Sequence, residues 1–127
     1  GLWASTCFVA FTDSAVLETA RRLRAEGIPC DVFHLDSFWQ RAHMWCDFEW
    51  DTARIPDPER LLAELHREGF HNCLWINPYV SLQSDLYREG ATHGYFLPRP
   101  DGSIYHPIVW SQLESKLGFS LMIQLQG

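Results

Sequence analysis

The sequence has little positive charge and lacks the short motifs that define several common enzyme classes. It contains 10 lysines and arginines against 16 aspartates and glutamates, and the resulting net charge of −6 argues against nucleic acid as a partner. It has no glycine-rich phosphate loop, no GxSxG motif and no recognised spacing of metal ligands. P-loop nucleotide chemistry, serine-hydrolase chemistry and a metal centre therefore find no support, and we expect no cofactor.

Long apolar runs and paired cysteines are missing too. No run approaches the ~20 apolar residues of a membrane span, and the N-terminus lacks the basic-then-apolar pattern of a signal peptide, so we expect a soluble protein without a membrane partner. The four cysteines, Cys7, Cys30, Cys46 and Cys73, are scattered and form no CxxC pair. Buried free thiols in a reducing compartment fit this pattern better than disulfides, which favours the cytoplasm.

Aromatic and acidic side chains are concentrated in residues 32–51. The 127 residues are 46% hydrophobic and 14% aromatic, enough for one globular domain. In this stretch, three tryptophans, three phenylalanines and four acids show no sustained helical or strand period. Carboxylates accept hydroxyl hydrogen bonds and rings cover C–H faces, so the stretch indicates a carbohydrate site. The alternative is a loop whose rings cover the end of a sheet.

Two similar strand–helix units precede and follow this stretch. Residues 12–14 can cap a helix that ends at Gly27, and a strand over 31–35 follows. Asp57 can cap a second helix with Pro58 at its first position; that helix ends at Gly69 and leads into an apolar run over 73–76. With GLWAST as the first strand, this predicts an α/β fold with a parallel sheet and right-handed crossovers.

The later part of the chain is less regular. We predict a short helix over 84–89 and a β-hairpin around Pro100-Asp101-Gly102, which would leave the parallel sheet as an excursion. Residues 119–124 also have the composition of a strand. In a βα protein the functional loops follow the carboxyl ends of the strands, so Phe8, Asp36 and Asn77 should line one face.

Asp36 is the first candidate functional group, because an acid at the mouth of a parallel sheet suits a ligand; a helix cap or loop salt bridge is the alternative. His34 is either a hydrogen-bonded core residue or a base. A metal site built from His34, Asp36, His43 and Asp47 matches no known ligand spacing. Asp47 and Glu49 could form an acid pair, but we interpret them as groups that fix the loop.

Six motifs then occur in a familiar order and spacing: GLWAST, VFHLDSFW, WCDFEWD, IPDPE, LWINPYV and RPDGS. Together they closely resemble the start of the catalytic barrel in glycoside hydrolase family thirty-one, and most of all bacterial α-xylosidases. Family members are retaining α-glycosidases that remove a sugar from the non-reducing end. The resemblance covers residues 1–105 and implies a partial TIM (β/α)8 barrel of about three βα units, with a parallel sheet and a β-hairpin excursion.

The resemblance also implies roles for five residues. Asp36 matches the carboxylate that binds hydroxyls of the sugar about to be released, and Trp75 matches the aromatic wall of that subsite. Phe8 and Phe38 match positions that crowd the space for a glucose hydroxymethyl group, which discriminates by about 1–3 kcal/mol per methylene-sized difference. The xylosidase pattern has cysteine where this chain has Ser37, which is smaller and more polar, so both xylose and glucose stay open as the preferred sugar.

The catalytic carboxylates of the family are expected elsewhere. A retaining glycosidase needs two carboxyl groups about 5 Å apart, and in the family both follow later strands. This sequence contains neither the Lys-Thr-Asp-type nucleophile motif nor the acid/base segment, and residues 106–127 depart from the family pattern. We therefore expect a divergent tail over 106–127, no catalytic residue and an inactive isolated chain; a truncated form and an altered reading frame are both open.

Three functions follow from these patterns. The first is a fragment of a retaining α-glycosidase that binds an α-xyloside or α-glucoside. The second is a non-catalytic carbohydrate-binding or assembly module, and the third is an unrelated small βα enzyme that uses Asp36 and His34. A complete barrel of this kind needs about 250 residues, so a sheet of three strands has open edges. We therefore expect a homo-oligomer, most simply a two-fold dimer, unless residues 119–124 cover an edge.

Overall fold

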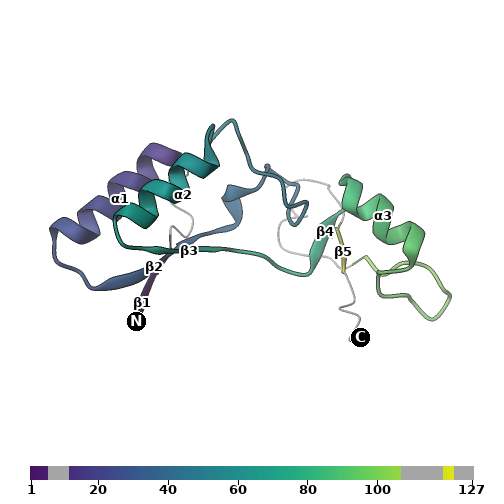
Figure 1. Cartoon of the computed structure of the whole chain (residues 1–127). Coiled ribbons are helices and arrows are strands. Elements are labelled where there is room, and N and C mark those ends of the chain that lie inside the picture. Colours follow the sequence, from purple (N-terminus) through teal and green to yellow (C-terminus); the bar gives the residue numbers. More distant parts are fainter. Residues whose placement is uncertain (6–11, 107–118, 122–127) are drawn as a thin grey trace. The chain divides into compact units, whose positions relative to one another are not determined.

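The computed structural model describes residues 1–5, 12–106 and 119–121, the last of these by their backbone alone (Figure 1). The chain divides into two compact units. The first comprises residues 1–41 and 50–75, and the second comprises residues 42–49 and 76–127. The aromatic and acidic stretch 32–51 is therefore shared between both units.

The first unit contains a parallel sheet of three strands, in the order β1-β2-β3. Its strands are β1 (Leu2–Ser5), β2 (Cys30–Leu35) and β3 (His71–Leu74). The predicted parallel sheet is confirmed. However, β3 begins at His71 and not at Cys73, because its backbone pairs with Val32 before the apolar run starts.

Both predicted helices of this unit are present, and their ends follow local sequence signals. Helix α1 (Asp13–Ala25) is capped by Thr12, whose side chain accepts a hydrogen bond from the Ala15 N–H. Helix α2 (Pro58–Arg67) is capped in the same way by Asp57 and begins with proline. Gly27 and Gly69 follow the two helices with φ of 69° and 82°, a conformation in which glycine is unstrained.

Helices α1 and α2 cover one face of the sheet, and the core lies between them and the strands (Figure 1). In β2 the residues alternate, so that Phe33 and Leu35 are buried beneath the helices. Phe33 meets Phe70 edge to face, with ring centroids 5.6 Å apart. The remaining buried members include Val16, Leu17 and Ala20 of α1, Leu61 and Leu65 of α2, and Ile55.

The opposite face of the sheet is less covered. Ala4 of β1 pairs with Phe33 on the helix side, so Trp3, which pairs with Val32, lies on the other side. Trp3 is 60% exposed and Leu2 is 52% exposed. The apolar sequences GLWAST and CLWIN are typical of fully buried central strands, but no residue of β1 or β3 is buried in the described chain, because both are outer strands and only one sheet face carries helices.

The second unit contains a two-stranded antiparallel sheet and one helix. Strand β4 (Tyr79–Ser81) pairs with β5 (Phe119–Leu121), and α3 (Asp85–His93) lies between them in the chain. The predicted helix thus continues four residues beyond Glu89, with Ser84 as its cap. Of the strand predicted over 119–124, residues 119–121 form β5 and residues 122–124 lie outside the described residues; the partner of β5 is β4 and not an edge of the parallel sheet.

The turn predicted at residues 100–102 is confirmed. The Arg99 N–H donates to the Ser103 carbonyl at 2.7 Å, and Gly102 has the positive φ that this turn requires. Flanking Pro98 and Ile104 form an isolated bridge, so the hairpin has no extended strands. Within the described residues, no helix is long and apolar enough to cross a membrane.

Candidate functional site

The carboxyl edge of the parallel sheet brings together residues from all three strands. Asp36 directly follows β2, and the Trp75 N–H, just after β3, donates to the Leu35 carbonyl at 2.9 Å. Ser5 ends β1 and pairs with His34 in the sheet register. Asp36 and Trp75 therefore lie at the same end of the sheet, where a βα fold places its functional loops.

Asp36 acts as a cap in addition to standing at this edge. Its Oδ1 accepts the backbone N–H of Ser37 at 2.7 Å, and it caps the short 3-10 helix η1 (Ser37–Trp39). Its Oδ2 accepts a longer hydrogen bond, 3.5 Å, from the Ser5 hydroxyl. Of the two alternatives raised by the sequence, the structure shows the cap, and the role of Asp36 as a ligand group stays a prediction.

Ser37 and Phe38 have different environments within η1. Ser37 is only 3% exposed, so its side chain is packed inside the described chain. Phe38 is half-buried, and the guanidinium carbon of Arg54 lies 5.5 Å from its ring centroid. The remaining predicted site residue, Phe8, lies outside the described residues.

The backbone of Trp75 is fixed by the loop that follows β2. The indole N–H of Trp39 donates to the Trp75 carbonyl at 2.8 Å, and the Gln40 amide donates to the same oxygen at 3.3 Å. Trp39 also meets Trp50 with ring centroids 5.0 Å apart. Trp39 is only 4% exposed, so this ring has the packing role that was the alternative for the aromatic stretch.

Residues 42–49 belong to the second unit and are held there by a cysteine. The Cys46 thiol donates to the Asn77 carbonyl at 2.9 Å and accepts the Asn77 N–H at 3.3 Å. Cys46 and Phe48 have φ of 58° and 61°, a conformation that costs a residue other than glycine about 1–2 kcal/mol. Asp47 accepts the backbone N–H of Glu49 at 3.0 Å, which supports its interpretation as a loop-fixing residue.

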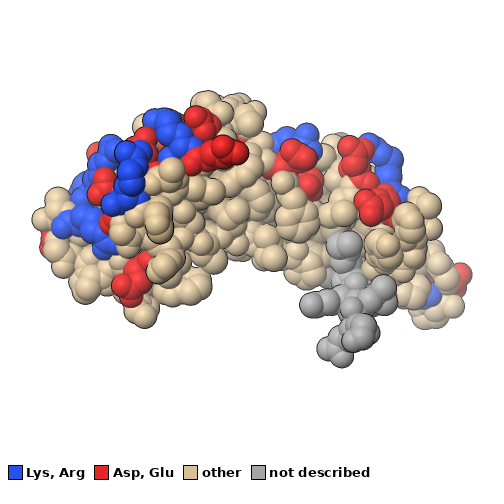
Figure 2. Space-filling view, viewed as in Figure 1, with Lys and Arg blue, Asp and Glu red and all other residues tan. Residues whose placement is uncertain are grey.

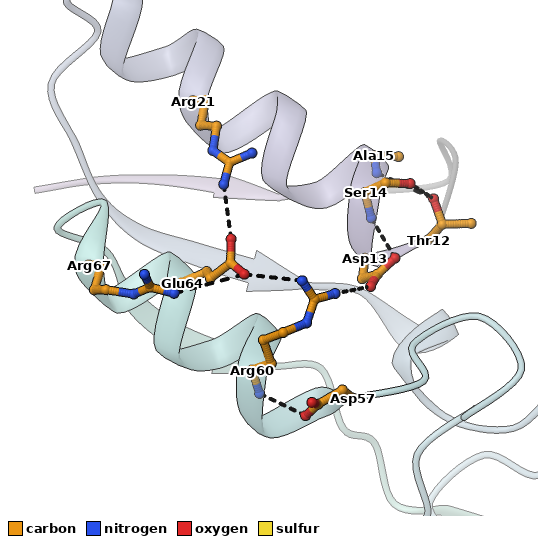
Figure 3. A network of polar contacts seen from close by, with 9 residues as sticks. All are labelled: Thr12, Asp13, Ser14, Ala15, Arg21, Asp57, Arg60, Glu64 and Arg67. Atoms are coloured by element: carbon orange, nitrogen blue, oxygen red, sulfur yellow. Dashed lines mark hydrogen bonds and ion pairs between the residues drawn. The ribbon is translucent and has the colours of Figure 1, made fainter.

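A charged groove lies on the outer surface of α1 and α2 (Figure 2). Glu64 accepts hydrogen bonds from Arg21 at 2.9 Å and from Arg60 at 3.2 Å, and Arg60 also binds Asp13 at 2.7 Å (Figure 3). Each of these charges has a partner of opposite sign within the groove. Its polar groups therefore hold the two helices together, and we do not assign it a ligand.

Two further observations concern the chemistry of the described residues. Among residues 1–5 and 12–106, no group of three or more His, Cys, Asp or Glu side chains could hold a metal ion. Ser5 was absent from the residues predicted to form the site, although its register with His34 brings it within hydrogen-bonding distance of Asp36. The alternation of side chains in parallel strands was the signal that could have identified it.

Comparison with known proteins gives the family. The glycosyl hydrolases family 31 TIM-barrel domain matches residues 1–121. The α-xylosidase XylQ of Lactiplantibacillus pentosus is 40% identical over 111 residues, which are 87% of this chain and 15% of that protein. An α-xylosidase of Emericella nidulans is 38% identical over 111 residues, 87% of this chain and 14% of that protein.

Solved structures share the fold. A family 31 α-xylosidase from a soil metagenome, complexed with xylose, is similar with a TM-score of 0.77 and a sequence identity of 21%. The match covers 96% of this chain and 17% of the α-xylosidase chain. A Flavobacterium johnsoniae dextranase complexed with glucose also has a TM-score of 0.77, with 20% identity over 96% of this chain and 14% of its own.

This chain thus spans about 15% of the length of the curated relatives that it matches. Its three parallel strands with helices on one face agree with part of an α/β barrel. The chain belongs to glycosyl hydrolase family 31, and its fold is a part of that family's TIM-barrel domain.

Proposed function

We propose that this chain contributes part of the sugar-binding subsite of a retaining α-glycosidase, of the α-xylosidase or α-glucosidase type, which hydrolyses α-linked sugars at the non-reducing end. The observation that carries the proposal is the position of Asp36 beside Trp75 at the carboxyl edge of the sheet. The names of the relatives support the sugar class, since two of them are α-xylosidases at 38% and 40% identity.

In this proposal Asp36 accepts hydrogen bonds from sugar hydroxyls. Charge-assisted hydrogen bonds of this kind are about twice as strong as neutral ones. Trp75 forms the wall against the C–H face of the ring. Phe38 and Phe8 restrict the space for the hydroxymethyl group that glucose carries at C5, and Ser37 supports Phe38 from inside the 3-10 turn. An apolar restriction of this size separates xylose from glucose by about 1–3 kcal/mol.

The two catalytic carboxylates are proposed to come from outside this chain. Hydrolysis with retention needs a nucleophile and an acid/base about 5 Å apart across the scissile bond. Asp36 is already engaged with Ser37 and Ser5 and is assigned to binding. Groups that orient a sugar without attacking it do not accelerate bond cleavage, so the isolated chain should release no nitrophenol from α-xylosides or α-glucosides.

We also propose that the isolated chain associates with itself. Trp3 and Leu2 are largely exposed on β1, and β1 and β3 are the two outer strands of the described sheet. Exposed apolar strands at a sheet edge favour pairing with another chain. Light scattering should find a dimer or larger species, and Trp3→Ser should shift it towards monomer; a monodisperse wild-type monomer would contradict this.

A reducing compartment, the cytoplasm, is proposed from the thiols. Cys30 is 2% exposed and its thiol lies 3.3 Å from the Leu2 carbonyl, while Cys46 is equally buried and bonded to Asn77. Among the described residues, Cys30, Cys46 and Cys73 form no disulfide with one another. Buried thiols that donate hydrogen bonds suit a compartment in which cysteines stay reduced.

The binding proposal is tested by titrating the chain with xylose and with glucose, observed by NMR. Asp36→Asn keeps the shape of the side chain but removes its charge, and should weaken binding about tenfold. Asp31→Asn is the matched control, because Asp31 lies near the opposite end of the same strand with its side chain 60% exposed. Equal affinities for the two variants would refute the role of Asp36.

A further inference from the structure

Three polar side chains at the sheet edge form a hydrogen-bonded sequence that crosses from β1 to β2. The Ser5 hydroxyl oxygen lies 3.1 Å from Nδ1 of His34 and 3.5 Å from Oδ2 of Asp36. Ser5 and His34 are register partners in the parallel pair, and they lie on the sheet face opposite the helices. The contact therefore depends on the sheet itself and not on a loop conformation.

The number of protons decides the direction of these hydrogen bonds. A serine hydroxyl carries one hydrogen, and an ionised aspartate can only accept. Since Ser5 donates its hydrogen to Asp36, its oxygen must act as the acceptor towards His34. Nδ1 of His34 must then carry a hydrogen, which leaves Nε2 without one in the neutral ring.

We infer that Ser5 and His34 are positioning residues for Asp36: His34 donates from Nδ1 to Ser5, and Ser5 donates to the Asp36 carboxylate. Together with the Ser37 N–H on Oδ1, this gives each carboxylate oxygen a donor from the protein. Two donors on different oxygens fix the plane of the carboxylate.

The orientation of the Asp36 carboxylate towards a sugar hydroxyl is then set by β1 through Ser5 and by η1 through Ser37. This consequence rests on the proposed function, whereas the hydrogen-bond sequence does not. A carboxylate oriented before binding loses less conformational entropy when the sugar arrives.

The first test needs no sugar. The ¹⁵N shifts of the neutral His34 ring, recorded at alkaline pH on the whole chain, should show the Nδ1–H tautomer, and Ser5→Ala should shift the ring towards the Nε2–H tautomer. His71→Asn, at the start of the neighbouring strand, is the control and should leave the His34 signals in place. An Nε2–H tautomer in the wild type, or no change in Ser5→Ala, would overturn the inference.

The second test uses xylose titration with paired substitutions. Ser5→Thr keeps the hydroxyl and His34→Asn places an amide donor near the position of Nδ1, so both variants should retain the xylose affinity within about twofold. Ser5→Ala and His34→Leu remove the hydrogen bonds, and each should weaken xylose binding about fivefold. If Ser5 and His34 only stabilised the fold, Ser5→Thr would lose as much xylose affinity as Ser5→Ala, and His34→Asn as much as His34→Leu. That result would count against the inference. If the wild type binds no xylose, the proposed function fails, and the His34 tautomer alone decides the inference.

Discussion

Replacing Arg24 with methionine should destabilise the first unit by about 3 kcal/mol, because this one side chain connects three elements. Its Nε–H donates to the Glu68 carbonyl at 2.6 Å, and its two terminal nitrogens donate to the carbonyls of Cys30 and Gly69 at 2.8 and 3.0 Å. Its guanidinium carbon also lies 3.6 Å from the ring centroid of Phe70. Arg24 therefore links the end of α1 to the end of α2 and the start of β2.

The magnitude follows from the acceptors that lose their donor. A hydrogen bond to a charged group contributes about 1.5–3 kcal/mol, and a cation over an aromatic ring about 0.5–1 kcal/mol. The sum of four such terms overstates the effect, because neighbouring contacts are not additive and water can reach the partly exposed carbonyls. Methionine keeps an apolar stem over Phe70. About 3 kcal/mol remains, and Arg24→Lys, which recovers one charged donor, should lose about 2 kcal/mol.

Urea unfolding followed by tryptophan fluorescence and circular dichroism measures this loss. With a slope of about 1.5 kcal/mol per molar urea, 3 kcal/mol corresponds to a midpoint lower by about 2 M. Arg22→Met is the control on the same helix, since the Arg22 side chain is 73% exposed and its ion pair of 3.3 Å is with the exposed Glu26. It should change stability by at most about 0.5 kcal/mol. Equal shifts for Arg22→Met and Arg24→Met would refute the reasoning.

Two further predictions concern the second unit. An alanine at Gly90 in α3 would place its Cβ 2.7 Å from the Phe96 ring, so Gly90→Ala should destabilise the chain by about 1–2 kcal/mol despite the better helix propensity of alanine. Phe96→Leu should offset part of that loss in the double variant. A higher urea midpoint for Gly90→Ala than for the wild type would contradict this prediction. Hydrogen bonds from the side chain and then the backbone of Ser103 hold the pKa of Asp101 below its ordinary value. The ionised carboxylate should therefore stabilise the turn fully at pH values above the ordinary pKa, and this contribution should be lost as the pH falls through the lowered pKa. Ser103→Ala should raise the pKa of Asp101 in a ¹³C carboxyl titration, and an unchanged midpoint would count against the assigned cause.

The helices of the first unit could be predicted because their signals are local. Thr12 and Asp57 accept hydrogen bonds from backbone groups three residues later, so each cap is complete within one turn of chain. The start of β3 was misplaced because His71 and Asn72 are polar, and only the pairing with β2 makes them strand residues. Strand assignment depends on a partner, which periodicity within one segment does not reveal.

The candidate site likewise has residues that the sequence could identify and one that only strand pairing reveals. Its Asp36 and Trp75 were identified from motifs, and their position at one sheet edge follows from the βα order. Ser5 was missed because its partner is 29 residues away, and the contact exists only through the register of β1 against β2.

The amino-acid sequence by itself determined the family motifs, the helix ends and the parallel order of the strands, since these depend on neighbouring residues and on chain connectivity. Tertiary structure alone decided which side chains meet. Arg24 reaches carbonyls more than forty residues away, Trp39 packs inside instead of forming a sugar platform, and Ser5 bonds to Asp36. The physical reason is that such contacts require strand register and packing to bring distant backbone together, and neither is encoded in any single segment.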